Sequence, residues 1–203
     1  GDVYKRQDLN GYLIINNALN KKELKDLNNI LDKLKNIKND EWAGHVHGHN
    51  YGGKEGLNLQ QIYEAGKPFE KLIDHPSWIN HMLHFVGGKG TFDHLHGPLF
   101  IDENFANIRG PGEAIGIHSG NPEGLQRNHY RYQNGKFHCS QVNILLALTN
   151  IGPGDGGTVI IPSSHKSNIV HPEFKDNKML KGGKVSSAAV SYTHLTLPTN
   201  KAV

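Results

Sequence analysis

Histidine is the residue type with the most chemical potential in this chain, with 14 copies in 203 residues. Imidazole is the commonest metal ligand in proteins and the usual general acid or base near neutral pH. The count alone identifies no site, so each group of histidines is weighed by its neighbours. The groups that matter are His45, His47 and His49, then His94 and His96, and finally His118.

The first group reads His-x-His-x-His from His45 to His49. On a strand, alternate side chains share one face and could hold a metal such as zinc, as in a hydrolase. Gly44, Gly48 and Asn50 favour a polar loop instead, and we expect residues 40–60 to be loop. His94 and His96, followed by Gly97 and Pro98, are interpreted in the same way.

His118 has a different setting, because it ends the apolar run Ala114–Ile117 that follows a Gly-Pro turn. A second run, Gln141–Leu148, predicts another strand and is followed by a glycine-rich turn. Thr158–Ile161 predicts a third strand, which leads into Pro162-Ser163-Ser164-His165.

The first half of the chain predicts helices that support this part. Residues 11–15 form an apolar run typical of a strand. Asn20 stands three residues before Glu23, a capping-box pattern, and apolar residues then recur at helical spacing, so we expect a helix over 21–37. A second helical region is predicted from Glu64 to Val86.

After residue 90 the helical spacing stops and short β-rich runs alternate with turns, including Leu99–Ile101. Helices followed by regularly spaced short strands indicate an antiparallel sandwich or barrel behind N-terminal helices. The length of 203 residues suits one domain.

Charge and cysteine content narrow the function classes. The formal net charge is +3, and no Lys/Arg run is long enough for a nucleic-acid or membrane-surface patch, so neither partner is expected. No run approaches the roughly 18 apolar residues of a membrane span. Cys139 is the single cysteine, which excludes an internal disulfide and indicates a reducing, cytoplasmic compartment.

Both ends of the chain look unrelated to the rest. Residues 1–7 and 190–203 resemble translated sequencing-adapter sequence, so we expect them to be non-native and the domain to span residues 8–189.

Three segments together resemble phytanoyl-CoA dioxygenase-like proteins. "ALTNIGPGDGGTVIIPSSHKSN" (147–168) is similar to that family's Ala-Leu, Gly-Gly, Pro-Gly-Ser-His-Lys segment, with Ser163 in place of glycine. "NGYLIINNALNKKELKDLNNIL" (10–31) and "FEKLIDHP" (69–76) resemble its opening strand and helix and its later short helix. The resemblance is collinear over about residues 10–175.

The resemblance implies a jelly roll, or double-stranded β-helix, mainly β with N-terminal helices and incomplete at the C-terminus. It also implies an oxygenase that uses Fe(II) and 2-oxoglutarate to hydroxylate a small organic substrate. The iron would be held by two histidines and one carboxylate. The alternatives are a cupin-like or metal-free jelly-roll binding module and an Fe-dependent halogenase.

Carried onto this sequence, the resemblance makes His118 the first metal ligand, with His129 and His138 as fallbacks. Gly120 stands where the family has Asp or Glu. Three explanations stay open: another acid such as Glu123 serves, a halide fills the position as in the family's halogenases, or the site holds no such triad.

The resemblance also places other groups. Gln141 and Asn143 would line the barrel interior and contact cosubstrate or substrate, although an ordinary hydrogen-bonded pair is an equal alternative. His165 resembles a structural turn histidine. The family's second metal histidine and the arginine for 2-oxoglutarate are expected beyond residue 180 and to be missing from this chain, and His194 in the tail is not taken as that ligand.

Overall fold

The computed structural model describes residues 2–50, 55–86, 97–113, 130–151, 155, 157–158, 160–166 and 193–197. The described chain mixes helices and strands. Its helices are α1 (Asp2–Asn10), α2 (Lys21–Leu34), η1 (Ile62–Ala65), α3 (Lys67–Glu70), α4 (Ile79–Phe85) and η3 (Ser164–Lys166). Its strands are β1 (Tyr12–Ile14), β2 (Trp42–Ala43), β3 (Val46–His49), β4 (Leu57–Gln60), β5 (Phe105–Ile108), β6 (Arg131–Gln133), β7 (Lys136–His138), β8 (Val142–Leu146) and β9 (Thr193–Leu197).

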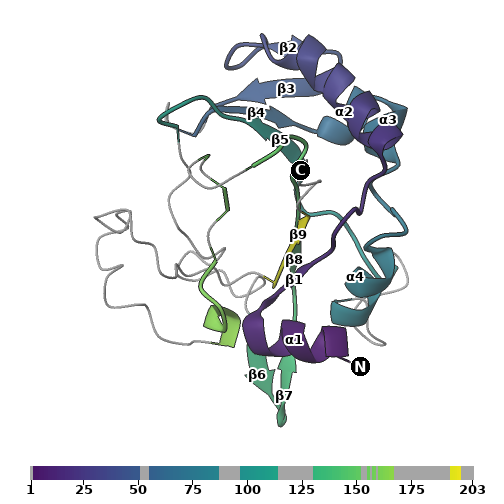
Figure 1. The fold of residues 1–203 in the computed structure, drawn as a ribbon, viewed down its shortest axis with the longest axis vertical. Helices are drawn as coiled ribbons and strands as arrows, with labels where there is room; N and C mark the ends of the chain where they lie inside the picture. Colours follow the sequence, from purple (N-terminus) through teal and green to yellow (C-terminus); the bar gives the residue numbers. More distant parts are fainter. Residues whose placement is uncertain are drawn as a thin grey trace.

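The described strands form three sheets. The largest is antiparallel, in the order β2-β3-β4-β5, and β6 and β7 form a separate antiparallel hairpin. The third sheet has the order β1-β9-β8, with β9 parallel to both neighbours. Helices α2, α3 and α4 lie on one side of these sheets, the right-hand side of Figure 1. The predicted combination of N-terminal helices with antiparallel strands is confirmed, and the jelly roll stays a prediction.

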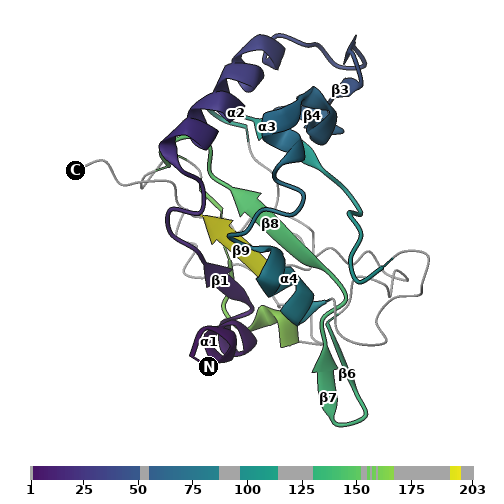
Figure 2. The ribbon, with the colours of Figure 1, turned by 90° about the vertical axis from the view of Figure 1, so that its right-hand side faces the viewer.

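One hydrophobic core joins the helices to both larger sheets. Its buried members include Leu27 of α2, Met82 of α4, Val46 of β3 and Leu59 of β4. Alternate residues of β8 pack against the same cluster, namely Val142, Ile144 and Leu146. Figure 2 shows α4 in front of β8 and β9. Each sheet therefore has one face on the core and one face turned away from it.

Helix α2 begins as predicted. The Asn20 side chain accepts hydrogen bonds from the backbone N–H groups of Lys22 and Glu23, at 2.9 and 3.0 Å. The Glu23 carboxylate in turn accepts a hydrogen bond from the Asn20 backbone N–H at 2.7 Å. The predicted capping box is thus confirmed. The helix ends at Leu34, three residues earlier than expected, where a turn bonds Ile37 N–H to the Leu34 carbonyl.

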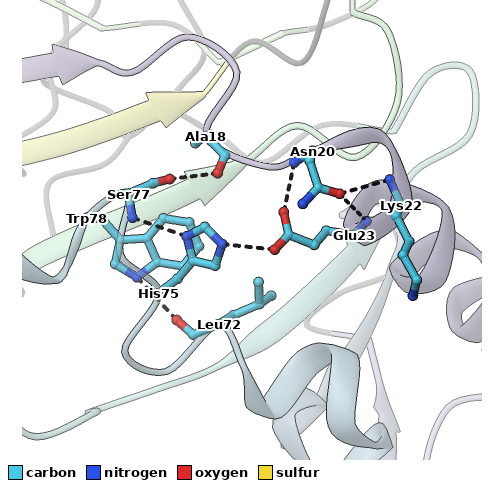
Figure 3. A network of polar contacts seen from close by, with 8 residues as sticks. All are labelled: Ala18, Asn20, Lys22, Glu23, Leu72, His75, Ser77 and Trp78. Atoms are coloured by element: carbon cyan, nitrogen blue, oxygen red, sulfur yellow. Dashed lines mark hydrogen bonds and ion pairs between the residues drawn. The ribbon is translucent and has the colours of Figure 1, made fainter.

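A polar network ties the start of α2 to the segment before α4 (Figure 3). His75 Nδ1 accepts the Ser77 N–H at 3.2 Å, so Nε2 carries the proton and faces the Glu23 carboxylate at 3.4 Å. The His75 ring stacks on Trp78, with 4.4 Å between centroids, and Trp78 Nε1 donates to the Leu72 carbonyl at 3.1 Å. Ser77 Oγ donates to the Ala18 carbonyl at 2.7 Å. The capping glutamate therefore also positions the α3–α4 connection.

Three sequence predictions are wrong in this region or further on. Residues 40–60 are not a loop, because they contain β2, β3 and β4. The predicted strand Leu99–Ile101 is irregular, and β5 begins at Phe105 instead. The described residues of the run Thr158–Ile161 also lie outside any strand. The second helical region exists but is divided into η1, α3 and α4, since Gly66 at φ 129° separates the first two.

The segments set aside at the two ends contribute elements. Residues 2–10 form α1, and residues 193–197 form β9 between β1 and β8. Among the helices that the structure describes, none has both the length and the apolar character needed to cross a bilayer.

Candidate active-site face

The antiparallel sheet carries polar side chains on the face turned away from the core. Residues directly opposite each other in an antiparallel ladder share a face. His49 is opposite Asn58, and Asn58 is opposite Asn107, which makes one row across β3, β4 and β5. A second row runs through Trp42, His47, Gln60 and Phe105. We call these two rows the polar face.

The alternation in the sequence explains this arrangement. In Leu57-Asn58-Leu59-Gln60 and Ala106-Asn107-Ile108, the apolar members pack on the core and the amides occupy the other face. Asn58 is nevertheless only 1% exposed. A buried amide on a sheet costs free energy unless its donors and acceptors are bonded. The hydrogen bonds of this row therefore decide what the face can do.

The amides of the first row are only partly bonded. Asn107 Nδ2 donates to Asn58 Oδ1 and to the Glu55 carbonyl, both at 2.9 Å. Asn58 Nδ2 and Asn107 Oδ1 are buried and have no hydrogen-bond partner among the described residues. One buried donor and one buried acceptor thus remain on adjacent strands.

Strand β8 repeats the pattern. Val142, Ile144 and Leu146 pack on the core, so Asn143 and Leu145 occupy the opposite face by alternation. Gln141, just before the strand, donates from Nε2 to Asp102 Oδ2 at 3.3 Å, while its Oε1 is buried with no partner among the described residues. Both amides predicted to line an interior are half-buried and stand at alternate positions.

Of the three histidines predicted as metal ligands, only His138 lies among the described residues. His118, His129, Glu123, His94 and His96 lie outside the described residues. His138, a fallback, is exposed at the end of β7 in the β6–β7 hairpin. Among the residues that the structure describes, no group of three His, Cys, Asp or Glu side chains could hold a metal ion.

The His-x-His-x-His run is a strand and not a loop. His47 and His49 share a face of β3 with ring centroids 5.9 Å apart, while His45 is exposed in the turn before the strand. The His47 ring stacks on Trp42 at 4.5 Å, and its Nε2 lies 3.8 Å from Asp40. Only two of the three histidines meet, so the described geometry does not favour a three-histidine zinc site.

The turn that carries the family resemblance docks on the start of the chain. His165 is 3% exposed, and its Nε2 lies 3.0 Å from the Asp8 carbonyl. A Cβ on Gly11, which has φ +82°, would overlap the His165 ring, so the close approach requires glycine there. Ser163 has φ 68° and donates to the Leu9 carbonyl at 2.6 Å. The left-handed conformation explains why glycine suits the position that Ser163 takes.

Burial lowers the pKa of His165 below its usual 6.5, and nearby Lys166 acts in the same direction, against the bond to the Asp8 carbonyl. Protonation would place an N–H on the buried Nδ1, which has no partner among the described residues. The unfolded chain therefore binds the proton more readily, and stability falls as the pH drops through about 6.5. We expect the free energy of unfolding to fall by on the order of 1 kcal/mol between about pH 8 and about pH 5.

Urea unfolding at the two pH values measures this effect. The variant His165→Gln should be less stable than the wild type at neutral pH but should have a flatter pH dependence. His138→Gln removes an exposed histidine and is the matched control, with the wild-type pH dependence expected. An equally steep dependence in His165→Gln would assign the effect to another group, such as His81, whose pKa burial also lowers.

A separate cavity of about 200 Å³ lies near α1. Its walls come from Tyr4, Gln7, Asp8, His84, Phe85, Tyr130, Phe137 and Cys139. Lys166 pairs with Asp8 at 2.7 Å and lies 4.8 Å from the centre of the Phe137 ring. Burial raises the pKa of Tyr130, which therefore stays protonated at physiological pH. Asp8 contacts both Lys166 and Tyr130, so the polar groups at this cavity already have partners. The cavity is separate from the polar face.

Comparison with known proteins decides the family. The family model described as phytanoyl-CoA dioxygenase matches residues 7–199. The chain belongs to the phytanoyl-CoA dioxygenase family. The resemblance seen in the sequence is thus confirmed over nearly the whole chain. No curated protein and no solved structure gave a significant match.

Membership of the phytanoyl-CoA dioxygenase family indicates an oxygenase in general terms, with Fe(II) and 2-oxoglutarate as the family's usual requirements. Asn58 and Asn107 were not singled out in the sequence. Their signal was the alternation of amides with apolar residues in two short runs. The loop interpretation of residues 40–60 concealed the run that contains Asn58.

Proposed function

We propose that this chain is the jelly-roll domain of a cytoplasmic Fe(II)- and 2-oxoglutarate-dependent oxygenase that hydroxylates a small organic substrate. The observation that carries the proposal is the family match over residues 7–199. Asn58 and Asn107 of the polar face and Gln141 beside β8 support it, because each supplies a buried side-chain atom that has no hydrogen-bond partner among the described residues. A metal-free binding module would share this face, so activity must decide.

The described residues include hydrogen-bond donors that suit 2-oxoglutarate, whereas the proposed first metal ligand lies outside them. Asn143 and the second N–H of Gln141 are donors of the kind that a 2-oxoglutarate carboxylate accepts. His118 is the proposed first metal ligand, and the second histidine and the arginine belong to sequence expected beyond residue 180. Bound Fe(II) with 2-oxoglutarate would supply the oxidising power, and the chain's own side chains would orient the substrate and exclude water.

The test uses a full-length protein that contains this domain. Fe(II)- and 2-oxoglutarate-dependent release of succinate should appear in the wild type. His118→Ala should lower it about 100-fold or more, because an iron ligand is lost. His45→Ala, which alters an exposed turn histidine, is the control and should keep full activity. Zinc-dependent activity that is lost in His45→Ala and needs no 2-oxoglutarate would contradict the proposal.

Halogenation is the second candidate, and Gly120 is the observation that favours it, since a glycine there leaves room for a halide. Anaerobic Fe(II) and 2-oxoglutarate give a visible charge-transfer absorption in the complex. If a halide occupies the position, chloride should shift that absorption, and Gly120→Asp should remove the shift. An absorption that ignores chloride would leave hydroxylation as the reaction.

A further inference from the structure

The Asn58–Asn107 pair is oriented by its surroundings in a way that leaves a defined pattern of hydrogen-bonding atoms. The Glu55 carbonyl is an acceptor, so Asn107 must turn Nδ2 toward it. The same Nδ2 also meets Asn58, which must therefore present Oδ1. Turning Asn107 round would place its oxygen against the Glu55 carbonyl, and turning Asn58 round would place its NH₂ group against that of Asn107. The unpartnered atoms are thus fixed as one donor, Asn58 Nδ2, and one acceptor, Asn107 Oδ1.

Chemistry narrows what could complete this pair. A carboxylate or phosphate accepts only, so it would be repelled by the Asn107 oxygen. An ammonium donates only and would leave the Asn58 N–H unbonded. A neutral group that both accepts and donates satisfies both atoms at once. Carboxamides and alcohols are such groups.

We infer that Asn58 and Asn107 recognise an uncharged carboxamide or hydroxyl group of the substrate, a specificity role that rests on the proposed oxygenase function. A site built to bond such a group rejects analogues that lack it strongly, because its buried amides would otherwise stay unbonded. The neighbours agree with a polar ligand, since the same face carries the imidazoles of His47 and His49. A long unsubstituted acyl chain does not suit this row.

The experiment measures binding and needs no turnover. Benzamide, benzoate and benzylammonium serve as probes, because they share one ring and differ in the terminal group. Side-chain NH₂ signals of Asn58 and Asn107 are followed by NMR in protein labelled with ¹⁵N-asparagine. Benzamide should shift both signals at about tenfold lower concentration than either charged probe.

Asn58→Leu, which has a similar volume, separates recognition from a structural role. It removes the unpartnered donor and leaves the Asn107 bond to Glu55. The melting temperature should stay the same or rise, while the benzamide shift at Asn107 should weaken about tenfold or more. Asn36→Asp changes an exposed asparagine and should leave both readouts unaltered.

Three outcomes would overturn the inference: equal responses to all three probes, no response to any, or a marked fall in the melting temperature of Asn58→Leu with an ordered water bound at Asn58. These outcomes are distinct from failure of the oxygenase proposal. Benzamide binding without succinate release would support the recognition role of Asn58 and Asn107 and contradict the oxygenase proposal. Succinate release without selectivity for benzamide would support the oxygenase proposal and contradict the recognition role.

Discussion

Trp78→Ala is expected to destabilise the fold by about 3–5 kcal/mol. Trp78 is 2% exposed and among the largest fully buried side chains. Its removal leaves a cavity in the core, takes the stacking surface from His75 and leaves the Leu72 carbonyl without its indole partner. Since a domain of this kind is stable by only about 5–15 kcal/mol, much of the chain should be unfolded at moderate temperature.

Urea denaturation followed by far-UV circular dichroism measures the loss. The chain offers a matched control in Trp42, its other tryptophan, which is 58% exposed and stacks on His47. Trp42→Ala should cost less than about 1 kcal/mol. Similar losses in the two variants would mean that the Figure 3 network does not support the core as described.

Gly48→Ala is expected to cost about 3 kcal/mol, although it adds a single methyl group. A Cβ at this position would overlap the Lys38 carbonyl oxygen and press on the Ile37 side chain. The overlapping atom belongs to the backbone, and the segment is held by the bond from Asp40 N–H to the Gly48 carbonyl at 2.8 Å. The strain cannot be relieved by a change of rotamer.

Thermal unfolding of Gly48→Ala is best compared with that of Gly44→Ala. Gly44 lies in the turn before β3 with φ +62°, and a Cβ there meets nothing within 4 Å. Its replacement should cost only the left-handed backbone penalty of about 1 kcal/mol. A Gly48→Ala protein as stable as Gly44→Ala would show that the 37–41 segment can move away from β3.

These two glycines also show where sequence reasoning failed. Glycines at 44 and 48 favoured a loop, yet only Gly44 marks a turn. Gly48 lies within a strand because another segment passes too close for any side chain, and that approach is set by tertiary packing that no local pattern records. The strands β3 and β4 were missed for this reason, and with them the row from His49 to Asn107.

The sequence predicted the structure correctly where short local patterns determine it. The Asn20–Glu23 capping box and the helical spacing of Leu27, Ile30 and Leu31 predicted the start and buried side of α2. The run Gln141–Leu148 predicted the strand β8, although not which of its residues pack on the core. The family followed from collinear segments, while the bonding of Asn58 depends on Asn107, 49 residues away, which only a fold can bring together.

The pairing of β1 with β9 has a consequence for how the protein is made. Residues 12–14 find their described ladder partners at residues 194–196. During synthesis the first strand must therefore wait, with Leu13 and Ile15 uncovered, until residues 194–196 have left the ribosome. Contacts between such distant parts of a chain form slowly. The β1–β9 pairing should accordingly form late, while the α2–α4 region can condense earlier.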